Sequence, residues 1–183
     1  ARFFGFFALC IAAANGVALA EDPLSLFIFY EVLSLATYPL VVHSGTPEAL
    51  AAGRKYLFYA LGGGAALLVG VAWLAAIAGS APFTPGGALD AVSGRTTELR
   101  LIFALMVAGF GVKAALMPLH GWLPGAMVAP APVSSLLHAV AVVKAGVFGI
   151  IRLVNELYGP DLATSLGVAA PLAALAAARV VLP

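Results

Sequence analysis

The chain contains 183 residues, of which 63% are hydrophobic and 9% are charged, and its mean hydropathy is +1.08. Soluble globular domains do not have this composition, so the sequence predicts a membrane protein. The net charge of +1 excludes a strongly basic nucleic-acid-binding surface. The single cysteine, Cys10, excludes a disulfide framework and a cysteine-based metal site.

A membrane-spanning helix needs about 20 apolar residues, and roughly six such spans fit between the polar breaks of the chain. We therefore expect an all-α polytopic membrane protein with a single transmembrane domain over residues 1–183. The chain has no initiating Met and no charged segment followed by a cleavage motif. No signal peptide is expected, and the chain is interpreted as a fragment of a longer protein.

The first two spans are predicted at about 3–20 and 24–43, with a polar turn between them. Glu31 lies near the middle of the second span, and Ser34 and Tyr38 follow three and seven residues later. At this spacing the three side chains share one face of a helix. Such a polar stripe must face protein or water rather than lipid.

A third span is predicted at about 56–78 and contains three consecutive glycines at 62–64. In a membrane, glycines allow a neighbouring helix to approach closely. A phosphate-binding loop is not favoured, because no Lys-Ser or Lys-Thr pair follows the glycines. Residues 79–97 are interpreted as an exposed loop in which little chemistry is visible.

The fourth span, about 98–128, carries Lys113 and is expected to break just after this residue. A proline removes a backbone donor, so several of them prevent one straight helix. The prolines in question are Pro118, Pro124, Pro130 and Pro132. Non-helical backbone at membrane depth is tolerated where protein or a wet cavity surrounds it, so the break predicts a functional cavity.

The last two spans are predicted at about 132–155 and 162–182, and the second of these is Ala-rich and carries no visible chemistry. The first carries the polar residues Ser134, Ser135, His138 and Lys144.

Three charged residues, Glu31, Lys113 and Lys144, are predicted at membrane depth, where a charge is costly and usually marks an ion or proton path. Glu31 and Lys113 are expected to pair because each offsets the other's desolvation. The alternative is a structural ion pair that joins two helices. Lys144 has no visible acidic partner, and a lysine in apolar surroundings can exchange its proton near neutral pH. The alternative for Lys144 is snorkelling to the membrane interface.

His138 and Lys144 are separated by a helical rise of roughly 9 Å, so water would have to bridge them. Histidine titrates near physiological pH, and the hydroxyls of Ser134 and Ser135 can hold such water. A packing role for His138 is the alternative. His120 is assigned a structural role, as a partner for backbone groups freed by the helix break. The eighteen residues between His120 and His138, without a second His at i+4, do not favour a metal or haem site.

The run GVKAALMPLHGWLPGAMVAPAPVSSLLHAVAVVKAGVFGIIR, preceded by FYEVLSLATYPLVVHSGT and AGRKYLFYALGG, resembles the antiporter-like subunits of respiratory complex I and of Mrp-type Na+/H+ antiporters. The sequence is most similar to the D-type subunit of the Mrp antiporters. The combination of KxxxxPLHxWLP, APxPVSxLLHA and VKAG is specific, and the resemblance covers nearly the whole chain.

The resemblance implies a transporter core of two inverted repeats, each with a discontinuous helix at the membrane midplane. It implies that Glu31 and Lys113 match the family's glutamate and broken-helix lysine, and that His138 and Lys144 lie where the family places relay residues. Gly125 and Ala131 depart from the Asp and Thr common in complex I, which favours the Mrp side. The first helices and the second repeat of the family pattern are absent from this chain.

The leading hypothesis is proton translocation through Glu31, Lys113, His138 and Lys144 in a multisubunit cation/proton antiporter or an NADH dehydrogenase-like complex. The alternatives are a membrane subunit of a quinone-linked oxidoreductase and a structural subunit that uses ion pairs for assembly. We expect no catalytic residue, cofactor, metal or nucleic acid. The expected partners are other membrane subunits, the lipid bilayer, protons and Na+ or K+, and the expected location is the bacterial inner membrane.

Overall fold

The computed structural model describes residues 2–181, and this part of the chain contains helices and no strand. The longer helices are α1 (Arg2–Leu19), α2 (Pro23–Val41), α3 (Pro47–Ala78), α4 (Thr96–Lys113), α7 (Val142–Arg152) and α9 (Ala169–Val181). The short helical elements are η1 (Asp90–Val92), η2 (Leu119–Trp122), α5 (Leu123–Ala126), α6 (Ala131–Ser135), η3 (Leu136–Val140), η4 (Leu153–Tyr158) and α8 (Pro160–Ser165). The prediction of an all-α protein is confirmed.

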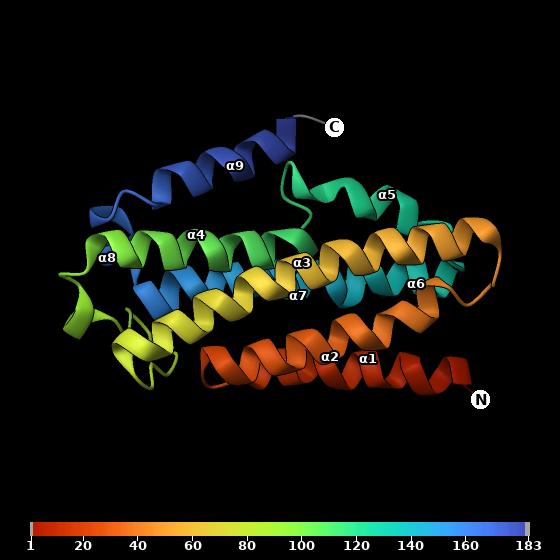
Figure 1. Cartoon of the computed structure of the whole chain (residues 1–183), viewed down its shortest axis with the longest axis horizontal. Coiled ribbons are helices and arrows are strands. Elements are labelled where there is room, and N and C mark those ends of the chain that lie inside the picture. The colour runs from red at the N-terminus through yellow and green to blue at the C-terminus, as the bar shows by residue number, and fades with distance from the viewer. Residues whose placement is uncertain (1, 182–183) are drawn as a thin grey trace.

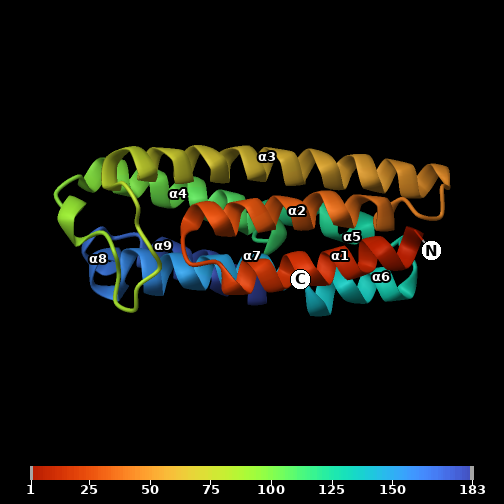
Figure 2. The same ribbon diagram turned by 90° about the horizontal axis from the view of Figure 1, so that it is seen from below.

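The long helices lie roughly along a common axis and alternate in direction (Figures 1 and 2). α3 packs against both α2 and α4, and α7 packs against α4 and α1. The amino terminus and the α2–α3 connection lie at one end of the bundle, whereas the α1–α2 turn and α8 lie at the other (Figure 2). We call the second of these the α8 end.

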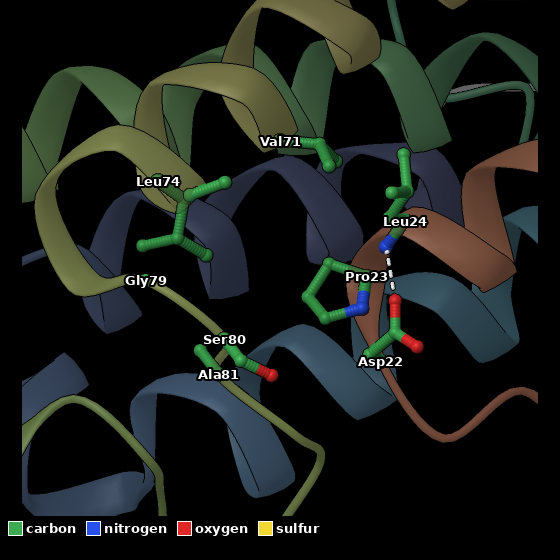
Figure 3. Close-up of a pocket in the computed structure, with 9 residues that line it drawn as sticks. Asp22, Pro23, Leu24, Val71, Leu74, Gly79, Ser80 and Ala81 are labelled. Atoms are coloured by element: carbon green, nitrogen blue, oxygen red, sulfur yellow. Dashed lines mark hydrogen bonds between the residues drawn. The ribbon is translucent and has the colours of Figure 1, made fainter.

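Asp22 begins α2 at the α8 end of the bundle. Its side chain accepts hydrogen bonds from the backbone N–H groups of Leu24 (2.8 Å) and Ser25 (2.9 Å), and Pro23 occupies the first turn. An acidic N-cap satisfies donors that the first turn leaves unpaired, and a proline at this position loses no helical hydrogen bond. Figure 3 shows this cap beside the end of α3, where a pocket of about 330 Å³ separates the two helices.

α3 begins at Pro47 rather than at the predicted residue 56, because Thr46 caps it by accepting a hydrogen bond from Ala49 N–H (3.2 Å). Its 32 residues span about 48 Å, more than the roughly 30 Å of hydrocarbon in a bilayer. Among the three glycines, Gly63 lies directly against α4: a Cβ added there would be 2.8 Å from Val112 and 3.3 Å from the Gly109 carbonyl. The close packing predicted for the three glycines is therefore found at Gly63, whereas a Cβ added to Gly62 would meet nothing within 4 Å.

The predicted break in the fourth span is confirmed, since α4 ends at Lys113. The chain then turns through Ala115, whose φ is +53°, and continues as η2 and α5. Pro118 precedes η2 and Pro124 lies in the first turn of α5. Pro130 is the N-cap of α6 and Pro132 lies in its first turn. All four prolines therefore stand at helix starts, where a missing N–H costs least.

The fifth span follows the prediction in position but is not one regular α-helix. It runs from Ala131 to Tyr158 and includes two π-helical stretches, η3 and η4. The span predicted at 162–182 differs more. It consists of α8 and α9, which are separated at Gly167, where φ is +70° and favours glycine. Residues 182–183 of that prediction lie outside the described residues.

Four helical stretches of the described chain are long and apolar enough to cross a membrane. They are Arg2–Leu19, Pro23–Val41, Pro47–Ala78 and Ala131–Tyr158. α4 has a comparable length of 18 residues but carries Glu98, Arg100 and Lys113, and α9 is shorter, with 13 residues. The protein is therefore an all-α polytopic membrane protein.

The 79–95 connection is largely exposed, as the sequence indicated, and it is also anchored to the bundle. Backbone N–H groups of Thr84, Gly86 and Ala88 donate to the carbonyls of Glu156, Asn155 and Leu157 at 3.0, 3.2 and 2.8 Å. The carbonyls at the end of η4 have no N–H donors from a following helical turn, and these bonds supply donors to them.

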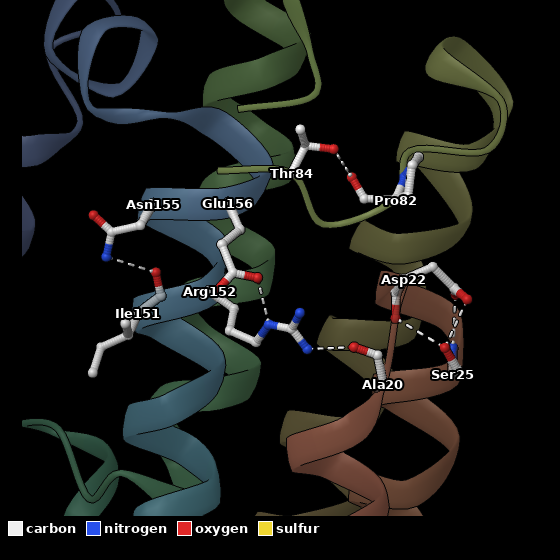
Figure 4. Close-up of polar contacts among 9 residues, drawn as sticks. All are labelled: Ala20, Asp22, Ser25, Pro82, Thr84, Ile151, Arg152, Asn155 and Glu156. Atoms are coloured by element: carbon white, nitrogen blue, oxygen red, sulfur yellow. Dashed lines mark hydrogen bonds and ion pairs between the residues drawn. The ribbon is translucent and has the colours of Figure 1, made fainter. Parts of the chain in front are cut away.

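Arg152 joins three segments at the α8 end (Figure 4). Its Nε donates to Glu156 Oε2 (2.7 Å), and a second guanidinium nitrogen donates to the Ala20 carbonyl at the end of α1. The guanidinium also lies over the Phe83 ring, 4.0 Å from its centroid. The arginine therefore holds α1, the 79–95 connection and the end of α7 together.

Candidate functional site

Lys113 is the most deeply buried charged residue of the described chain, with 1% of its surface exposed. It ends α4, and its ammonium donates to the backbone carbonyl of Tyr30 on α2. The same ammonium lies over the Tyr30 ring, 3.4 Å from the ring centroid. A carbonyl oxygen and the negative face of an aromatic ring both stabilise a cation in an apolar environment. The end of α4 thus places the Lys113 ammonium between two groups of Tyr30 that stabilise a cation.

Glu31 lies next to this site but does not form the expected direct ion pair with Lys113. Within residues 2–181, ion pairs of 4.0 Å or less join Arg95 to Glu98 and Arg152 to Glu156. Glu31 is half-buried, and its Oε1 is buried without a hydrogen-bond partner among the described residues. The carboxylate and the ammonium are therefore neighbours that this conformation leaves unpaired.

The predicted polar face of α2 is only partly formed. Ser34 is buried, and its Oγ donates to the Tyr30 carbonyl (3.2 Å), which is the acceptor of Lys113 as well. Tyr56 from α3 donates to the Ser34 carbonyl (3.3 Å). Tyr38 is half-buried and packs instead against Gly53, where an added Cβ would lie 3.2 Å from its ring. Ser34 therefore belongs to the Lys113 site and Tyr38 does not.

His138 lies in the π-helical stretch η3 and is half-buried. Its Nδ1 is 3.2 Å from the carbonyl oxygen of Ser134. Because a carbonyl can only accept, this contact requires the proton on Nδ1 and leaves Nε2 free to accept. The side chain of Ser134 is half-buried and that of Ser135 is exposed. Of the two serines, Ser134 is the one that orients the histidine.

Lys144 lies on α7 and is exposed in the isolated chain. It lines a groove of about 290 Å³ between α1 and α7, together with Asn15 of α1. Lys144 and Asn15 lie within apolar helices, so their polar groups require a polar neighbour or water outside this chain. The structure thus brings Lys113 and Glu31 together and places Lys144 on a separate face.

His120 does not supply the backbone contacts expected of it. Its Nδ1 is buried and has no hydrogen-bond partner in the described part of the chain. Trp122 fulfils this role instead, since its indole Nε1 donates to the Val112 carbonyl at the end of α4 (2.7 Å). The Trp122 ring also packs edge-on against Tyr56, with 5.3 Å between centroids.

Sequence reasoning missed Tyr30, Trp122 and Tyr56. Nothing in their spacing distinguishes them from aromatic packing residues, and their partners lie far away in the chain. Among residues 2–181, no group of three His, Cys, Asp or Glu side chains is placed to hold a metal ion.

The family described as NADH:quinone oxidoreductase/Mrp antiporter, transmembrane, matches residues 20–182. The chain belongs to this family. The match includes the α2 site around Glu31, the broken helix after Lys113 and the α6–α7 region with His138 and Lys144. The resemblance expected from the sequence is therefore confirmed.

Two relatives represent the two branches of the family. A D-type subunit of the Na(+)/H(+) antiporter of Bacillus subtilis is 30% identical over 153 residues, which cover 84% of this chain and 31% of the relative. The NADH-quinone oxidoreductase subunit N of Desulforudis audaxviator is 34% identical over 162 residues, covering 86% and 32%. The chain thus spans about one third of these relatives.

Solved structures of the family have the same fold. The Mrp complex from Dietzia contains a chain that superposes with a TM-score of 0.79 at 29% identity, covering 90% of this chain and 18% of that one. Respiratory complex I from Thermus thermophilus gives a TM-score of 0.68 at 26% identity, covering 82% and 34%.

Proposed function

We propose that this chain is a proton-translocating segment of a multisubunit cation/proton antiporter or NADH dehydrogenase-like complex in the bacterial inner membrane. The observation that carries the proposal is the buried Lys113 ammonium at a helix break, bound by a carbonyl and an aromatic face but not by a carboxylate. A lysine held in this way can change its protonation state when a nearby charge moves.

Glu31 is the charge that moves in this mechanism. When its carboxylate approaches Lys113, the attraction adds to that of the Tyr30 carbonyl and holds the proton on the ammonium. When the carboxylate withdraws, burial favours the neutral amine, and Lys113 releases one proton to an adjacent water. With Glu31 unpaired and the ammonium still bound at Tyr30, the arrangement in the structure would precede the release of the proton in this cycle.

His138 is the next acceptor. With the proton of its Nδ1 directed at the Ser134 carbonyl, Nε2 carries the lone pair that takes a proton from water. Lys144, a rise of roughly 9 Å along the helix, receives the proton through a further water. Because Lys144 is exposed beside Asn15, it passes the proton to polar groups of the surrounding complex. The exchanged cation is Na+ or K+ in an antiporter assembly.

The test is proton transport by the intact complex in inverted membrane vesicles, with Lys113→Ala compared with wild type. Lys55→Ala is the matched control, because Lys55 is an exposed lysine on α3. We expect Lys113→Ala to abolish transport while the amount of assembled complex stays normal, and Lys55→Ala to leave both unchanged. Undiminished transport by an assembled Lys113→Ala complex would refute the proposal.

A purely structural role for the same residues gives a different outcome. Replacing Glu31 and Lys113 together by Gln and Met removes both charges and keeps the side-chain volumes similar. If the pair serves transport, this complex assembles and does not transport protons. If the two residues serve assembly, the amount of complex falls and the complex that remains transports normally.

A further inference from the structure

The carboxylate of Glu31 lies directly against the backbone of Gly64 on α3. A Cβ added to Gly64 would be 2.7 Å from Glu31 Oε1, 2.9 Å from its carboxyl carbon and 3.0 Å from Oε2. Non-bonded carbon and oxygen atoms do not approach this closely, so any other side chain at this position would displace the carboxylate or the helix. Gly64 therefore provides the space that the carboxylate occupies.

The three consecutive glycines of α3 face three different surroundings. A Cβ on Gly62 would meet nothing within 4 Å, and one on Gly63 would meet Val112 and the Gly109 carbonyl of α4. Gly64 alone of the three faces Glu31. Helix packing accounts for Gly63 but not for Gly64, because the three atoms nearest to a Cβ at Gly64 all belong to one carboxylate.

No hydrogen bond holds the buried carboxylate oxygen of Glu31 in this space. Oε1 has no partner among residues 2–181, and neither ion pair of this part of the chain includes Glu31. Meanwhile Lys113 is bound at Tyr30, the residue that precedes Glu31. The carboxylate therefore occupies room at Gly64, and no group of residues 2–181 binds its Oε1 there.

We infer that Gly64 is a positioning residue that accommodates the Glu31 carboxylate in its unpaired state, and that a side chain at position 64 drives Glu31 into a lasting ion pair with Lys113. This inference rests on the proposed function for its consequence, since a permanent pair would retain the proton on Lys113 and stop transport. The steric relationship itself does not depend on transport.

The experiment compares Gly64→Ala with Gly62→Ala in the intact complex. Both changes add one methyl group, at positions two residues apart in the same helix, so their effects on helix propensity are matched. The direct measurement is treatment with the membrane-permeant dicyclohexylcarbodiimide. This reagent takes up a carboxylate oxygen and the proton of the paired ammonium to form an O-acylisourea. The neutral amine left in contact then displaces a urea from it and forms an amide. Mass spectrometry then quantifies the Glu31–Lys113 cross-link.

We expect Gly64→Ala to increase the cross-link yield above wild type and to reduce proton transport, while Gly62→Ala changes neither. An equal cross-link yield in the two variants would overturn the inference. Failure of the proposed function would give a different result. Lys113→Ala would then transport protons normally, whatever cross-link yield the two glycine variants show.

A second variant covers the case in which Gly64→Ala fails to assemble. Glu31→Asp shortens the side chain by one methylene and withdraws the carboxylate from position 64. If Gly64 acts through Glu31, the Gly64→Ala/Glu31→Asp complex assembles as well as Glu31→Asp alone. If the double variant also fails to assemble, Gly64 serves the packing of α3 and the inference is wrong.

Discussion

Lys113 on α4 donates to the backbone carbonyl of Tyr30 on α2 and lies over the ring of the same residue, 3.4 Å from its centroid. One residue therefore binds the ammonium twice, through its main chain and through its side chain. The Tyr30 hydroxyl returns the contact by donating to the Gly109 carbonyl of α4 (3.0 Å). This reciprocal arrangement fixes the end of α4 against α2.

Replacing Tyr30 separates the two roles of its side chain. Tyr30→Phe removes the hydrogen bond to Gly109 and keeps the ring under the ammonium, so it should cost about 1 kcal/mol of stability and leave transport largely intact. Tyr30→Leu also removes the ring face, worth about 0.5–2 kcal/mol more to the charged lysine. Thermal unfolding and proton transport of the two purified variants measure the difference. Equal transport by both would show that the ring does not stabilise Lys113.

Trp122→Phe tests the hydrogen bond that supports the end of α4. The change preserves an aromatic ring beside Tyr56 but leaves the buried Val112 carbonyl without the indole donor. Because this carbonyl still accepts from Ala115 N–H (3.2 Å), we expect a loss of about 0.5–1.5 kcal/mol in the free energy of unfolding. Trp73→Phe is the control, because the indole of Trp73 makes no hydrogen bond within residues 2–181. Similar melting temperatures for the two variants would contradict this role of Trp122.

Arg152→Gln should destabilise the α8 end more than Arg95→Gln. The Arg152 side chain is 12% exposed, and its ion pair with Glu156 is accompanied by the bond to Ala20. The Arg95 side chain is 53% exposed in its pair with Glu98. We expect a loss of about 1.5–3 kcal/mol for Arg152→Gln and at most about 1 kcal/mol for Arg95→Gln.

The measurement for this pair is limited proteolysis of the 79–95 connection. Loss of Arg152 should speed cleavage there, because the guanidinium no longer packs on Phe83. Cleavage at the wild-type rate in Arg152→Gln would mean that the backbone hydrogen bonds anchor the connection without the arginine.

Asp22 should make the start of α2 sensitive to acid. Partial burial raises the pKa of its carboxyl group, but hydrogen bonds from Ser25 and from the backbone N–H groups of Ser25 and Leu24 outweigh this effect, so the pKa lies below its usual value. A carboxyl group whose folded-state pKa is depressed contributes stability above its unfolded pKa of about 3.9 and loses it as pH falls through the folded value.

The measurement is thermal stability between neutral pH and about pH 3, a range that includes the unfolded pKa. Asp22→Ala should cost about 1 kcal/mol at neutral pH and lose less stability on acidification than wild type. Asp22→Ser keeps an uncharged cap, so it should be nearly as stable as wild type at neutral pH. On acidification it should lose as little stability as Asp22→Ala. A wild-type acid response in both variants would assign the pH dependence to another group.

Sequence by itself determined the class of the protein, the location of the helix break and the packing role of Gly63. These features follow from composition, from the missing N–H of each proline and from the missing Cβ of each glycine, all of which are properties of neighbouring residues. The family motifs also lie within short stretches, so they were readable without a structure. The division of 162–182 at Gly167 was not predicted, because an isolated glycine in an Ala-rich run does not by itself end a helix.

Tertiary structure decided which groups meet. Lys113 and the Tyr30 carbonyl that it binds are 83 residues apart, and Arg152 and the Ala20 carbonyl are 132 residues apart. A backbone carbonyl has no signature in the sequence, so charge pairing pointed to Glu31 as the partner of Lys113. The fold instead gave the lysine a carbonyl and a ring, because the close approach of α2, α3 and α4 places the Glu31 carboxylate against Gly64.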